Sequence, residues 1–224
     1  MTKRETSGSS KTRVFIVDDH PVVRQGLAQM IGQQADFTVC GEAADVSTAL
    51  KMIQELTPDM AVVDLNLKDS SGLDLIRDLK VRLPNLPVLV LSMYDESFYG
   101  ERAIRAGARG YLMKTEAPEK VILALQRIRG GGIYLSDSIS QAILGRLSAL
   151  SANKSAPIEC LTDRELEVFR LIGEGLRPRD IANRLHLSVK TIETYREHLK
   201  AKLNLATAGD LLQYAIRWAQ AQES

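Results

Sequence analysis

Short apolar runs alternate with amphipathic segments between residues 13 and 129. The runs are VFIV (14–17), FTVC (37–40), MAVV (60–63), VLVL (88–91) and GYLM (110–113). Each has about the length of one buried strand, and unbroken apolarity is typical of parallel strands covered on both faces. The segments between them carry apolar residues three or four positions apart, as in Val46, Leu50, Ile53 and Leu56. This alternation predicts a doubly wound α/β domain with about five parallel strands.

The pattern changes after residue 129. RGGGIYL (129–135) interrupts the last of these helical segments, and SANKSAPIE (151–159) is small, polar and contains proline. Residues 136–150 have the spacing of a linker helix, and from Leu161 onward only helical patterns remain. We therefore expect a disordered tail at 1–11, an α/β domain at 12–130, a partly helical linker at 131–157 and an all-α domain at 158–224.

Composition and charge narrow the class of protein. The 224 residues are 45% hydrophobic and 25% charged with a net charge of +1, so any basic surface for nucleic acid must be local. Cys40 and Cys160 are the two cysteines and show no metal-ligand spacing, which predicts a reducing compartment without a disulfide framework. The polar N-terminus and the lack of a long apolar run predict a cytoplasmic protein without a membrane partner.

Polar side chains directly follow four of the predicted strands. Asp18 and Asp19 follow the first strand, Asp64 the third, Ser92 the fourth and Lys114 the fifth. In an open α/β sheet the functional crevice lies at the carboxyl ends of the strands. For a strand order of 2-1-3-4-5 the first and third strands are neighbours, so the three carboxylates are expected to meet at one edge.

Three clustered carboxylates repel one another unless a cation neutralises them. Oxygen ligands that leave positions for water suit Mg²⁺. Lys114 would add a fixed positive charge, and Ser92 a hydroxyl within reach of Asp64. The arrangement predicts that Asp64 acts as a nucleophile and forms an acyl phosphate. A helix cap is the structural alternative for Asp18, and a capping or surface role is favoured for His20.

This set of residues resembles the receiver domain of two-component response regulators. The resemblance covers residues 13–130 and includes PDMAVVDLNLKDSSGLDLI (58–76), with Gly72 after the active-site loop. It implies that a sensor histidine kinase phosphorylates Asp64. It also implies that Asp18 and Asp19 bind Mg²⁺ directly or through water.

The same resemblance implies roles for three further positions. The backbone carbonyl of Asn66 would complete the metal site. Ser92 and Tyr111 match the hydroxyl and aromatic switch residues that shift when phosphate arrives, although core packing is the alternative for Tyr111.

Residues 161–205 carry three helical patterns with short breaks between them. Thr162 and Glu165 form a capping box that opens the first, and Ser188 caps the third. The apolar positions predicted to face inward are Leu166, Phe169, Ile172, Ile181, Ala182, Leu185, Ile192, Leu199 and Leu203. A tight turn before the third pattern and an exposed polar face on it predict a helix-turn-helix.

Positive charge is concentrated around the third pattern. Residues 177–202 hold seven Lys or Arg and three acidic residues, whereas 157–224 as a whole holds ten of each. The phosphates of double-stranded DNA are the natural partner of such a region. For any single lysine, the alternative is an ordinary solvent-exposed position on a helix without a DNA contact.

The segment resembles the LuxR-type DNA-binding domain, the four-helix module of the NarL/FixJ class of response regulators, over residues 158–222. The matching motifs are LTDRE (161–165), IANRL (181–185), SVKTIET (188–194) and KL (202–203). The residues that the resemblance places at base edges are Lys190, Glu193, Thr194 and Glu197. The phosphate contacts that we expect are Arg177, Arg179, Arg196 and Lys200. The last helix would carry a homodimer contact through Leu211, Leu212, Ala215 and Trp218, or pack onto the helical core, or do both.

The chain departs from the LuxR-type pattern at several positions. The second helix opens with Arg-Pro-Arg-Asp (177–180) instead of a small polar cap, and Tyr195 stands where histidine is common. The loop NLATAGD (204–210) lacks the usual arginine. His186 occupies a turn position that is usually glycine, which costs about 1 kcal/mol if that residue needs positive φ.

These patterns favour a transcription regulator, not an enzyme, in which phosphorylation alters dimerisation and DNA binding. A haloacid-type phosphohydrolase also uses an aspartate nucleophile with Mg²⁺, but it requires a second aspartate two positions on, where this chain has Asn66. A third hypothesis is an interaction protein whose receiver-like domain binds a partner and for which DNA is irrelevant.

Overall fold

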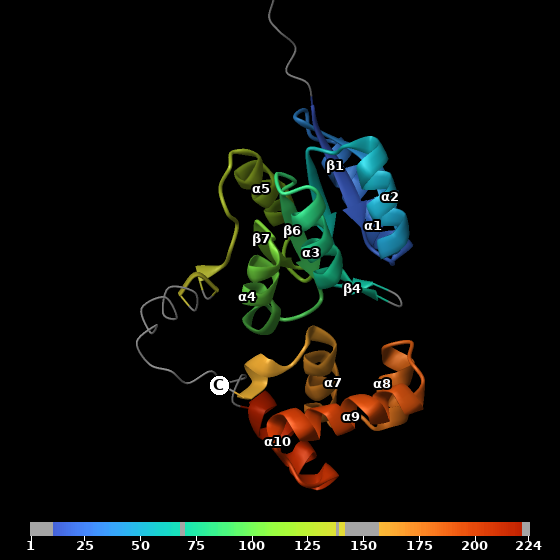
Figure 1. Cartoon of the computed structure of the whole chain (residues 1–224). Coiled ribbons are helices and arrows are strands. Elements are labelled where there is room, and N and C mark those ends of the chain that lie inside the picture. The colour runs from blue at the N-terminus through green and yellow to red at the C-terminus, as the bar shows by residue number, and fades with distance from the viewer. Residues whose placement is uncertain (1–10, 68–69, 138, 142–156, 221–224) are drawn as a thin grey trace, which may run out of the picture. The chain divides into compact units, whose positions relative to one another are not determined.

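The structure is a computed structural model that describes residues 11–67, 70–137, 139–141 and 157–220. The chain divides into two compact units, Met1–Ala149 and Leu150–Ser224, and each is described here by itself (Figure 1). The predicted tail, apart from Lys11, lies outside the described residues, as does most of the predicted linker. The described residues 137 and 139–141 of the expected linker helix are helical.

A five-stranded parallel sheet forms the centre of the first unit. Its strands are β1 Thr12–Val17, β2 Phe37–Ala43, β3 Met60–Val63, β6 Val88–Ser92 and β7 Gly110–Met113. The order is β2-β1-β3-β6-β7 with every neighbouring pair parallel, which confirms the predicted strands and their order. Val14–Val17 and Met60–Val63 are buried throughout, and this explains their unbroken apolarity.

Helices cover both faces of this sheet. They are α1 Pro21–Gly32, α2 Val46–Leu56, α3 Gly72–Arg82, α4 Glu96–Ala106 and α5 Pro118–Arg129. The apolar faces of α1 and α5 form one core with alternate residues of the strands. Helices α2, α3 and α4 contact one another in that order across the opposite face (Figure 1). This is the doubly wound arrangement predicted from the sequence.

A small hairpin between β3 and α3 was not predicted. It consists of β4 Asn66–Leu67 and β5 Ser70–Ser71, which pair antiparallel. The hairpin brings Gly72 against the strand end, because a Cβ on Gly72 would lie 2.1 Å from the Asp64 carbonyl oxygen. Glycine at this position therefore permits the close backbone approach that shapes the loop after Asp64.

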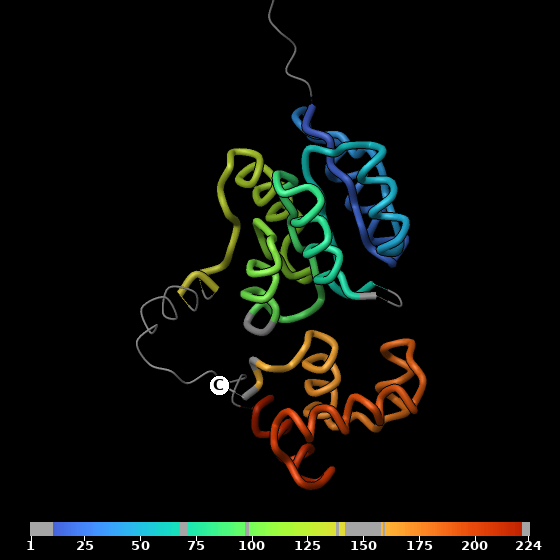
Figure 2. The backbone as a smooth tube through the Cα atoms, viewed as in Figure 1, coloured from blue at the N-terminus to red at the C-terminus, as the bar shows by residue number. Residues whose placement is uncertain are grey.

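The second unit is helical, as Figure 2 traces. Its elements are the 3₁₀ helix η1 Pro157–Cys160 and the helices α7 Asp163–Gly173, α8 Pro178–Arg184, α9 Val189–Leu203 and α10 Ala208–Gln220. The predicted capping box at Thr162 and the predicted cap at Ser188 are both confirmed. All nine apolar residues predicted to face inward are buried. His186 in the turn before α9 has φ 53°, so the unusual residue does occupy a left-handed position.

Helix α10 packs closely onto α7. The Phe169 ring lies 5.7 Å from that of Tyr214 and 5.4 Å from that of Trp218. A Cβ on Gly173 would lie 2.6 Å from the Ala215 carbonyl oxygen, so glycine allows this close approach. Among the described helices of the two units, none is long and apolar enough to cross a membrane.

Candidate functional site

The three predicted carboxylates meet at the carboxyl ends of β1 and β3. Asp18 and Asp64 are almost fully buried, at 1% and 2% exposure. One ligand atom from each of Asp18, Asp19, His20 and Asp64 lies within 4.8 Å of the others. The neighbouring positions of β1 and β3 in the sheet produce this cluster, because parallel neighbours end at the same edge.

Lys114 joins the cluster from the end of β7. Its Nζ lies 2.6 Å from Asp18 Oδ2 and 2.7 Å from Asp64 Oδ2, and its side chain is 8% exposed. The lysine therefore neutralises part of the negative charge of two buried carboxylates at once. Burial acts to lower the pKa of Lys114, and the two carboxylates outweigh it and raise the pKa.

Backbone groups hold the carboxylates in place. Asp64 Oδ1 accepts a hydrogen bond from the Asn66 N–H at 3.1 Å, and Asp18 Oδ1 accepts one from the His20 N–H at 2.8 Å. Arg24 donates to the Asp18 carbonyl at 2.5 Å. These contacts fix the aspartates before any ligand arrives.

The Asp19 carboxylate leaves one oxygen without such a bond. Its Oδ1 is buried and accepts no hydrogen bond from the described residues, although His20 Nδ1 lies 2.6 Å away. His20 precedes α1 at the N-cap position, where its side chain makes no cap bond, and it is 60% exposed. A donor set with oxygens from three carboxylates within 4.8 Å of one another fits a hard divalent cation.

Burial dominates the titration of the central carboxylate. It raises the pKa of Asp64 to about 6, against the opposing effect of the Lys114 charge and hydrogen bond. The Asp18 charge adds to the rise. Above pH 7 the carboxylate is therefore mostly ionised and available as a nucleophile.

Ser92 and Tyr111 lie beside the cluster and both bind the backbone of Tyr94. Ser92 Oγ accepts a hydrogen bond from the Tyr94 N–H at 3.2 Å, and the Tyr111 hydroxyl donates to the Tyr94 carbonyl at 2.8 Å. Tyr111 is 1% exposed, and burial raises its pKa. The Tyr94 ring in turn stacks on the Tyr99 ring, with centroids 4.7 Å apart. Sequence reasoning did not identify Tyr94 or Tyr99, because their role depends on the path of the backbone after β6.

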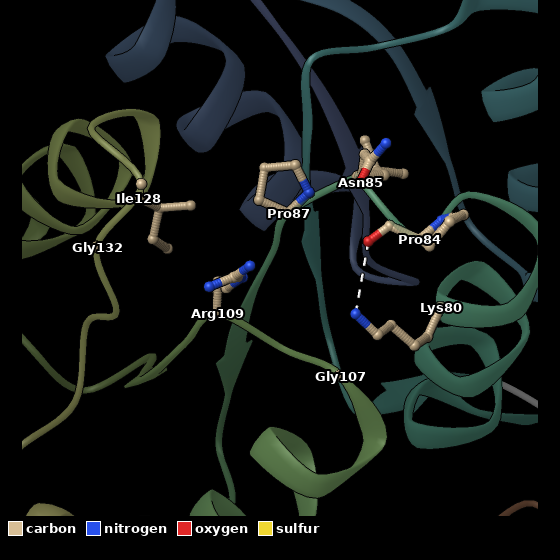
Figure 3. Close-up of a pocket in the computed structure, with 10 residues that line it drawn as sticks. Lys80, Pro84, Asn85, Pro87, Gly107, Arg109, Ile128 and Gly132 are labelled. Carbon is tan, nitrogen blue, oxygen red and sulfur yellow. Dashed lines mark hydrogen bonds between the residues drawn. The ribbon is translucent and has the colours of Figure 1, made fainter.

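A pocket of about 180 Å³ lies at the opposite end of the strands, near the start of β6 and β7. Figure 3 shows Lys80 in this pocket, where its Nζ donates to the Pro84 carbonyl at 3.5 Å. The Lys80 side chain also packs against Gly107, where a Cβ would meet three of its carbons at 3.0 Å. These contacts give Lys80 a structural role, and the pocket contains none of the predicted site residues.

In the second unit, α8, the turn at His186 and α9 form the predicted helix-turn-helix. Exposed side chains on α9 include all four residues predicted at base edges: Lys190, Glu193, Thr194 and Glu197. The predicted phosphate contacts Arg177 and Arg179 are exposed as well, whereas Arg196 and Lys200 are partly buried. The two predicted sets therefore share one helix-turn-helix, whose exposed surface offers both charged and polar groups.

Three of the predicted phosphate contacts form ion pairs with acidic side chains nearby in the sequence. Arg196 lies 2.9 Å from Glu193, and Lys200 lies 3.0 Å from Glu197. Arg177 likewise lies 2.9 Å from Asp180. A DNA phosphate must therefore compete with a carboxylate for three of the four predicted phosphate contacts.

Two of the four residues predicted at a dimer contact on α10 are buried within the unit. Leu211 and Ala215 are 1% and 0% exposed within the unit itself, because they pack toward α7 and the helical core. Their burial fits the alternative of packing onto the helical core. Leu212 is 41% exposed and Trp218 is partly buried, so a contact through α10 would rest on the exposed side of the helix.

Comparison with known proteins matches each unit to a family. Residues 14–126 match the family described as response regulator receiver domain, and residues 159–215 match bacterial regulatory proteins, luxR family. The chain is 32% identical to the oxygen regulatory protein NreC of Staphylococcus epidermidis over 92% of this chain and 97% of that protein. It is 37% identical to the DNA-binding transcriptional activator DevR/DosR of Mycobacterium tuberculosis over 86% of this chain and 88% of that protein.

Solved structures of similar architecture also align with most of the chain. A structure of the RcsB response regulator of Salmonella typhimurium aligns with a TM-score of 0.63 at 28% identity, over 92% of this chain and 98% of that one. RcsB bound to promoter rprA in the presence of phosphomimetic BeF3- aligns with a TM-score of 0.59 at 27% identity, with the same coverage.

Proposed function

The chain belongs to the response regulators that join a receiver domain to a LuxR-family domain, and we propose that phosphorylation of Asp64 controls its binding to DNA. The protein is a DNA-binding transcription regulator. The receiver domain is the first unit and the DNA-binding domain the second. The proposed boundaries are 12–130 and 158–224, with a linker at 131–157.

The position of the Asp64 carboxylate carries the proposal. It ends a buried strand between the Asn66 N–H at 3.1 Å and the Lys114 ammonium at 2.7 Å. A carboxylate oxygen held in this way can form a bond to the phosphorus of a phosphohistidine on a sensor kinase while the P–N bond breaks. The released imidazole nitrogen takes up a proton, and the product is an acyl phosphate on Asp64. Lys114 is placed to neutralise the oxygens of the transferred group.

Mg²⁺ is the cation that suits this donor set. Asp18, Asp19 and Asp64 would hold it, directly or through water, and the backbone carbonyl of Asn66 would complete the site. The gathering of ligand oxygens from all three carboxylates within 4.8 Å of one another supports this assignment. Bound there, Mg²⁺ would neutralise charge on the phosphoryl group.

The switch would involve Ser92 and Tyr111. A phosphoryl group on Asp64 offers oxygens that the Ser92 hydroxyl can bind, and Ser92 is at present bonded to the Tyr94 backbone. Movement of Ser92 would change the support of Tyr94 and of the Tyr111 hydroxyl that is bonded to it. The two arrangements provide the two states that a phosphorylation switch requires.

DNA contact is assigned to the helix-turn-helix of α8 and α9. Lys190, Glu193, Thr194 and Glu197 are the proposed base contacts, and the phosphate contacts are Arg177, Arg179, Arg196 and Lys200. The phosphorylated protein is proposed to act as a homodimer, with the exposed Leu212 and the partly buried Trp218 of α10 at the contact. Such a dimer would read two half-sites about one helical turn, ~10 bp, apart.

The first test is intact mass after incubation with acetyl phosphate and Mg²⁺. We expect one added phosphoryl group on wild type and none on Asp64→Asn. Asp78→Asn is the matched control, because Asp78 is an exposed acid of α3 and should leave the reaction unchanged. Absence of the added group in wild type, with Mg²⁺ shown to bind, would contradict phosphorylation control. Anisotropy with labelled duplex DNA then compares the phosphorylated and unphosphorylated forms.

A further inference from the structure

Two ion pairs of the same kind follow one another along α9. Arg196 Nη1 donates to both carboxylate oxygens of Glu193, at 2.9 and 3.2 Å. Lys200 Nζ lies 3.0 Å from Glu197 Oε1. In both pairs the acid precedes the base by three residues, and the second pair repeats the first about one helical turn further on. We call Glu193 and Glu197 the α9 acids.

The acid is the more exposed member of each pair. In the first pair the Glu193 side chain is 49% exposed and that of Arg196 is 21% exposed. In the second pair the values are 67% for Glu197 and 20% for Lys200. A carboxylate has lone pairs for about four hydrogen bonds, so one cation leaves room for a further donor. The α9 acids therefore present acceptor oxygens to a partner outside the domain.

The other two proposed base contacts of α9 differ from the acids in their hydrogen-bonding groups. The Thr194 hydroxyl donates to the Lys190 carbonyl at 3.0 Å, so its proton is already used within the helix. The Lys190 ammonium can only donate hydrogen bonds, whereas an ionised carboxylate can only accept them. Among the four proposed base contacts, only the α9 acids therefore require a donor on the base that they meet.

The donors in the major groove of DNA are few. Guanine and thymine present only acceptors there, besides the thymine methyl group, whereas cytosine presents its N4 amino group and adenine its N6 amino group beside the N7 acceptor. Adenine is matched by a side chain that both accepts and donates, such as asparagine or glutamine. A carboxylate, which only accepts, is matched by cytosine. The chemistry of both α9 acids therefore favours cytosine.

We propose that Glu193 and Glu197 each accept a hydrogen bond from the N4 amino group of a cytosine. Four residues of helix rise by about 6 Å, so the two cytosines of a half-site lie about two base-pair steps apart. Arg196 and Lys200 offset the repulsion between the carboxylates and the DNA phosphates. The acids penalise sequences that offer no donor, so they contribute specificity at the expense of affinity. The proposal rests on the proposed function, because it requires α9 to read DNA.

The first test selects binding sites from a randomised duplex library with the full-length protein, with and without acetyl phosphate and Mg²⁺. For wild type we expect two enriched cytosines in each half-site. Glu193→Gln should change the preference at one of them to adenine, because glutamine binds adenine N6 and N7 together. Glu197→Gln should do the same at the other. Selection of the same bases by wild type and both variants would overturn the proposal.

Glu55→Gln is the matched control for this selection. Glu55 is an exposed acid of α2 in the receiver domain, so the variant loses the same charge outside the helix-turn-helix. It should select the same site as wild type. A change of base preference in Glu55→Gln equal to that in the α9 variants would show that net charge sets the preference, against the proposal.

A second test addresses the hydrogen bond itself, by anisotropy with duplexes that carry N4-methylcytosine at one selected position. The methyl group replaces the amino hydrogen that faces the groove and leaves the pairing with guanine in place. We expect the affinity of wild type to fall about tenfold, and that of the variant at the corresponding acid to be unaffected. 5-Methylcytosine keeps the amino donor and controls for added bulk. An equal loss of affinity with both methylated bases would overturn the hydrogen bond.

The outcomes separate this proposal from phosphorylation control. A site that is enriched equally with and without acetyl phosphate, although Asp64 is shown to take up the phosphoryl group, would refute the control of DNA binding by phosphorylation. The two α9 variants would still decide the cytosine contacts in that case. A wild type that enriches no sequence under either condition would overturn the cytosine contacts.

Discussion

Lys114 Nζ lies 2.7 Å from Asp64 Oδ2, and the side chains are 8% and 2% exposed. This is a buried ion pair that is also shared with Asp18. Charges removed from water are costly unless they are paired, so the lysine stabilises an otherwise repulsive cluster. The same ammonium is proposed to bind the transferred phosphoryl group. Lys114 therefore stabilises the carboxylate cluster before the reaction and is proposed to neutralise the phosphoryl oxygens during it.

Lys114→Met should destabilise the receiver domain by about 3 kcal/mol at pH 8, because buried carboxylates lose their partner. The loss should shrink toward pH 5. Burial already raises the pKa of Asp64 to about 6, and removal of the cation raises it further, so protonation relieves the repulsion as the pH falls. Urea unfolding followed by far-ultraviolet circular dichroism measures this difference.

Lys120→Ala is the control for that experiment. Lys120 pairs with Glu116 at 2.5 Å, but the two side chains are 48% and 34% exposed, so its removal should leave the stability nearly unchanged. Lys114→Met should also take up phosphoryl from acetyl phosphate far more slowly than wild type. Equal stability of the Lys114 and Lys120 variants at pH 8 would contradict the structural role of the buried pair.

Gly72 should be intolerant of any side chain. A Cβ would lie 2.1 Å from the Asp64 carbonyl oxygen and 2.7 Å from Leu65 Cα, so the backbone beside the nucleophile must move. We expect Gly72→Ala to cost about 2–3 kcal/mol and to slow phosphoryl uptake. Gly26→Ala, in open space on α1, should instead be neutral or stabilise by up to about 1 kcal/mol. Thermal unfolding of the two variants beside wild type tests the contrast.

The strands, their order and the main site were predictable because they follow from strong local signals. Unbroken apolar runs mark buried parallel strands, and the polar residue after each run is placed at one edge by the sheet itself. That reasoning brought Asp18, Asp64 and Lys114 together correctly. It did not find the β4–β5 hairpin, because two-residue strands carry no periodic pattern.

Other features depend on tertiary contacts or on signals that the sequence analysis did not use. The shared binding of Ser92 and Tyr111 to Tyr94 depends on the backbone after β6, and no side-chain pattern encodes it. The Glu193–Arg196 pair was available from its i,i+3 spacing, which brings opposite charges together on one helix face. Leu211 fits either a core or a dimer contact by spacing alone, and only packing shows that it is buried.

Glu167 should make the DNA-binding domain less stable at alkaline pH. It is 4% exposed, and burial raises its pKa to about 7, while the charges of Arg170 and Arg184 act to lower it. A carboxyl whose pKa is higher in the folded state loses stability as the pH rises from about 4.5 through about 7. Glu167→Gln should therefore stabilise the domain by about 1–2 kcal/mol at pH 8 and by little at pH 4. Part of this gain in stability is lost, because the substitution removes the ion pair between Glu167 and Arg164, which lie 2.6 Å apart.

The single tryptophan, Trp218, packs on Phe169 in this domain and reports its unfolding by fluorescence. Urea titrations of wild type and Glu167→Gln between pH 4 and pH 8 give the difference in the free energy of unfolding at each pH. Glu197→Gln is the control, because it removes the same charge from a side chain that is 67% exposed. A parallel profile for wild type and Glu167→Gln would show that Glu167 does not titrate in this range.

The ion pairs on α9 predict opposite effects of two neighbouring substitutions on DNA binding. If Arg196 binds a phosphate, Arg196→Ala should weaken binding to all sequences alike and reduce the slope of log K against log salt by about 1. Glu193→Gln should strengthen binding to non-specific DNA and increase the slope, because Arg196 loses the carboxylate that lies 2.9 Å away. If Glu193 also reads a base, the ratio of specific to non-specific affinity falls in the same variant.

Fluorescence anisotropy with duplex DNA at several salt concentrations measures the slopes for both α9 variants. Arg105→Ala provides a matched control, since Arg105 pairs with Glu101 at 2.7 Å on α4 of the receiver domain and is 68% exposed. It removes the same charge and the same kind of helical ion pair but lies outside the helix-turn-helix, so its slope should equal that of wild type. An equal loss of slope for Arg105→Ala and Arg196→Ala would mean that net charge, and not contact at α9, governs binding. A changed slope for Arg196→Ala alone places a DNA phosphate at α9, where it must displace Glu193 from Arg196.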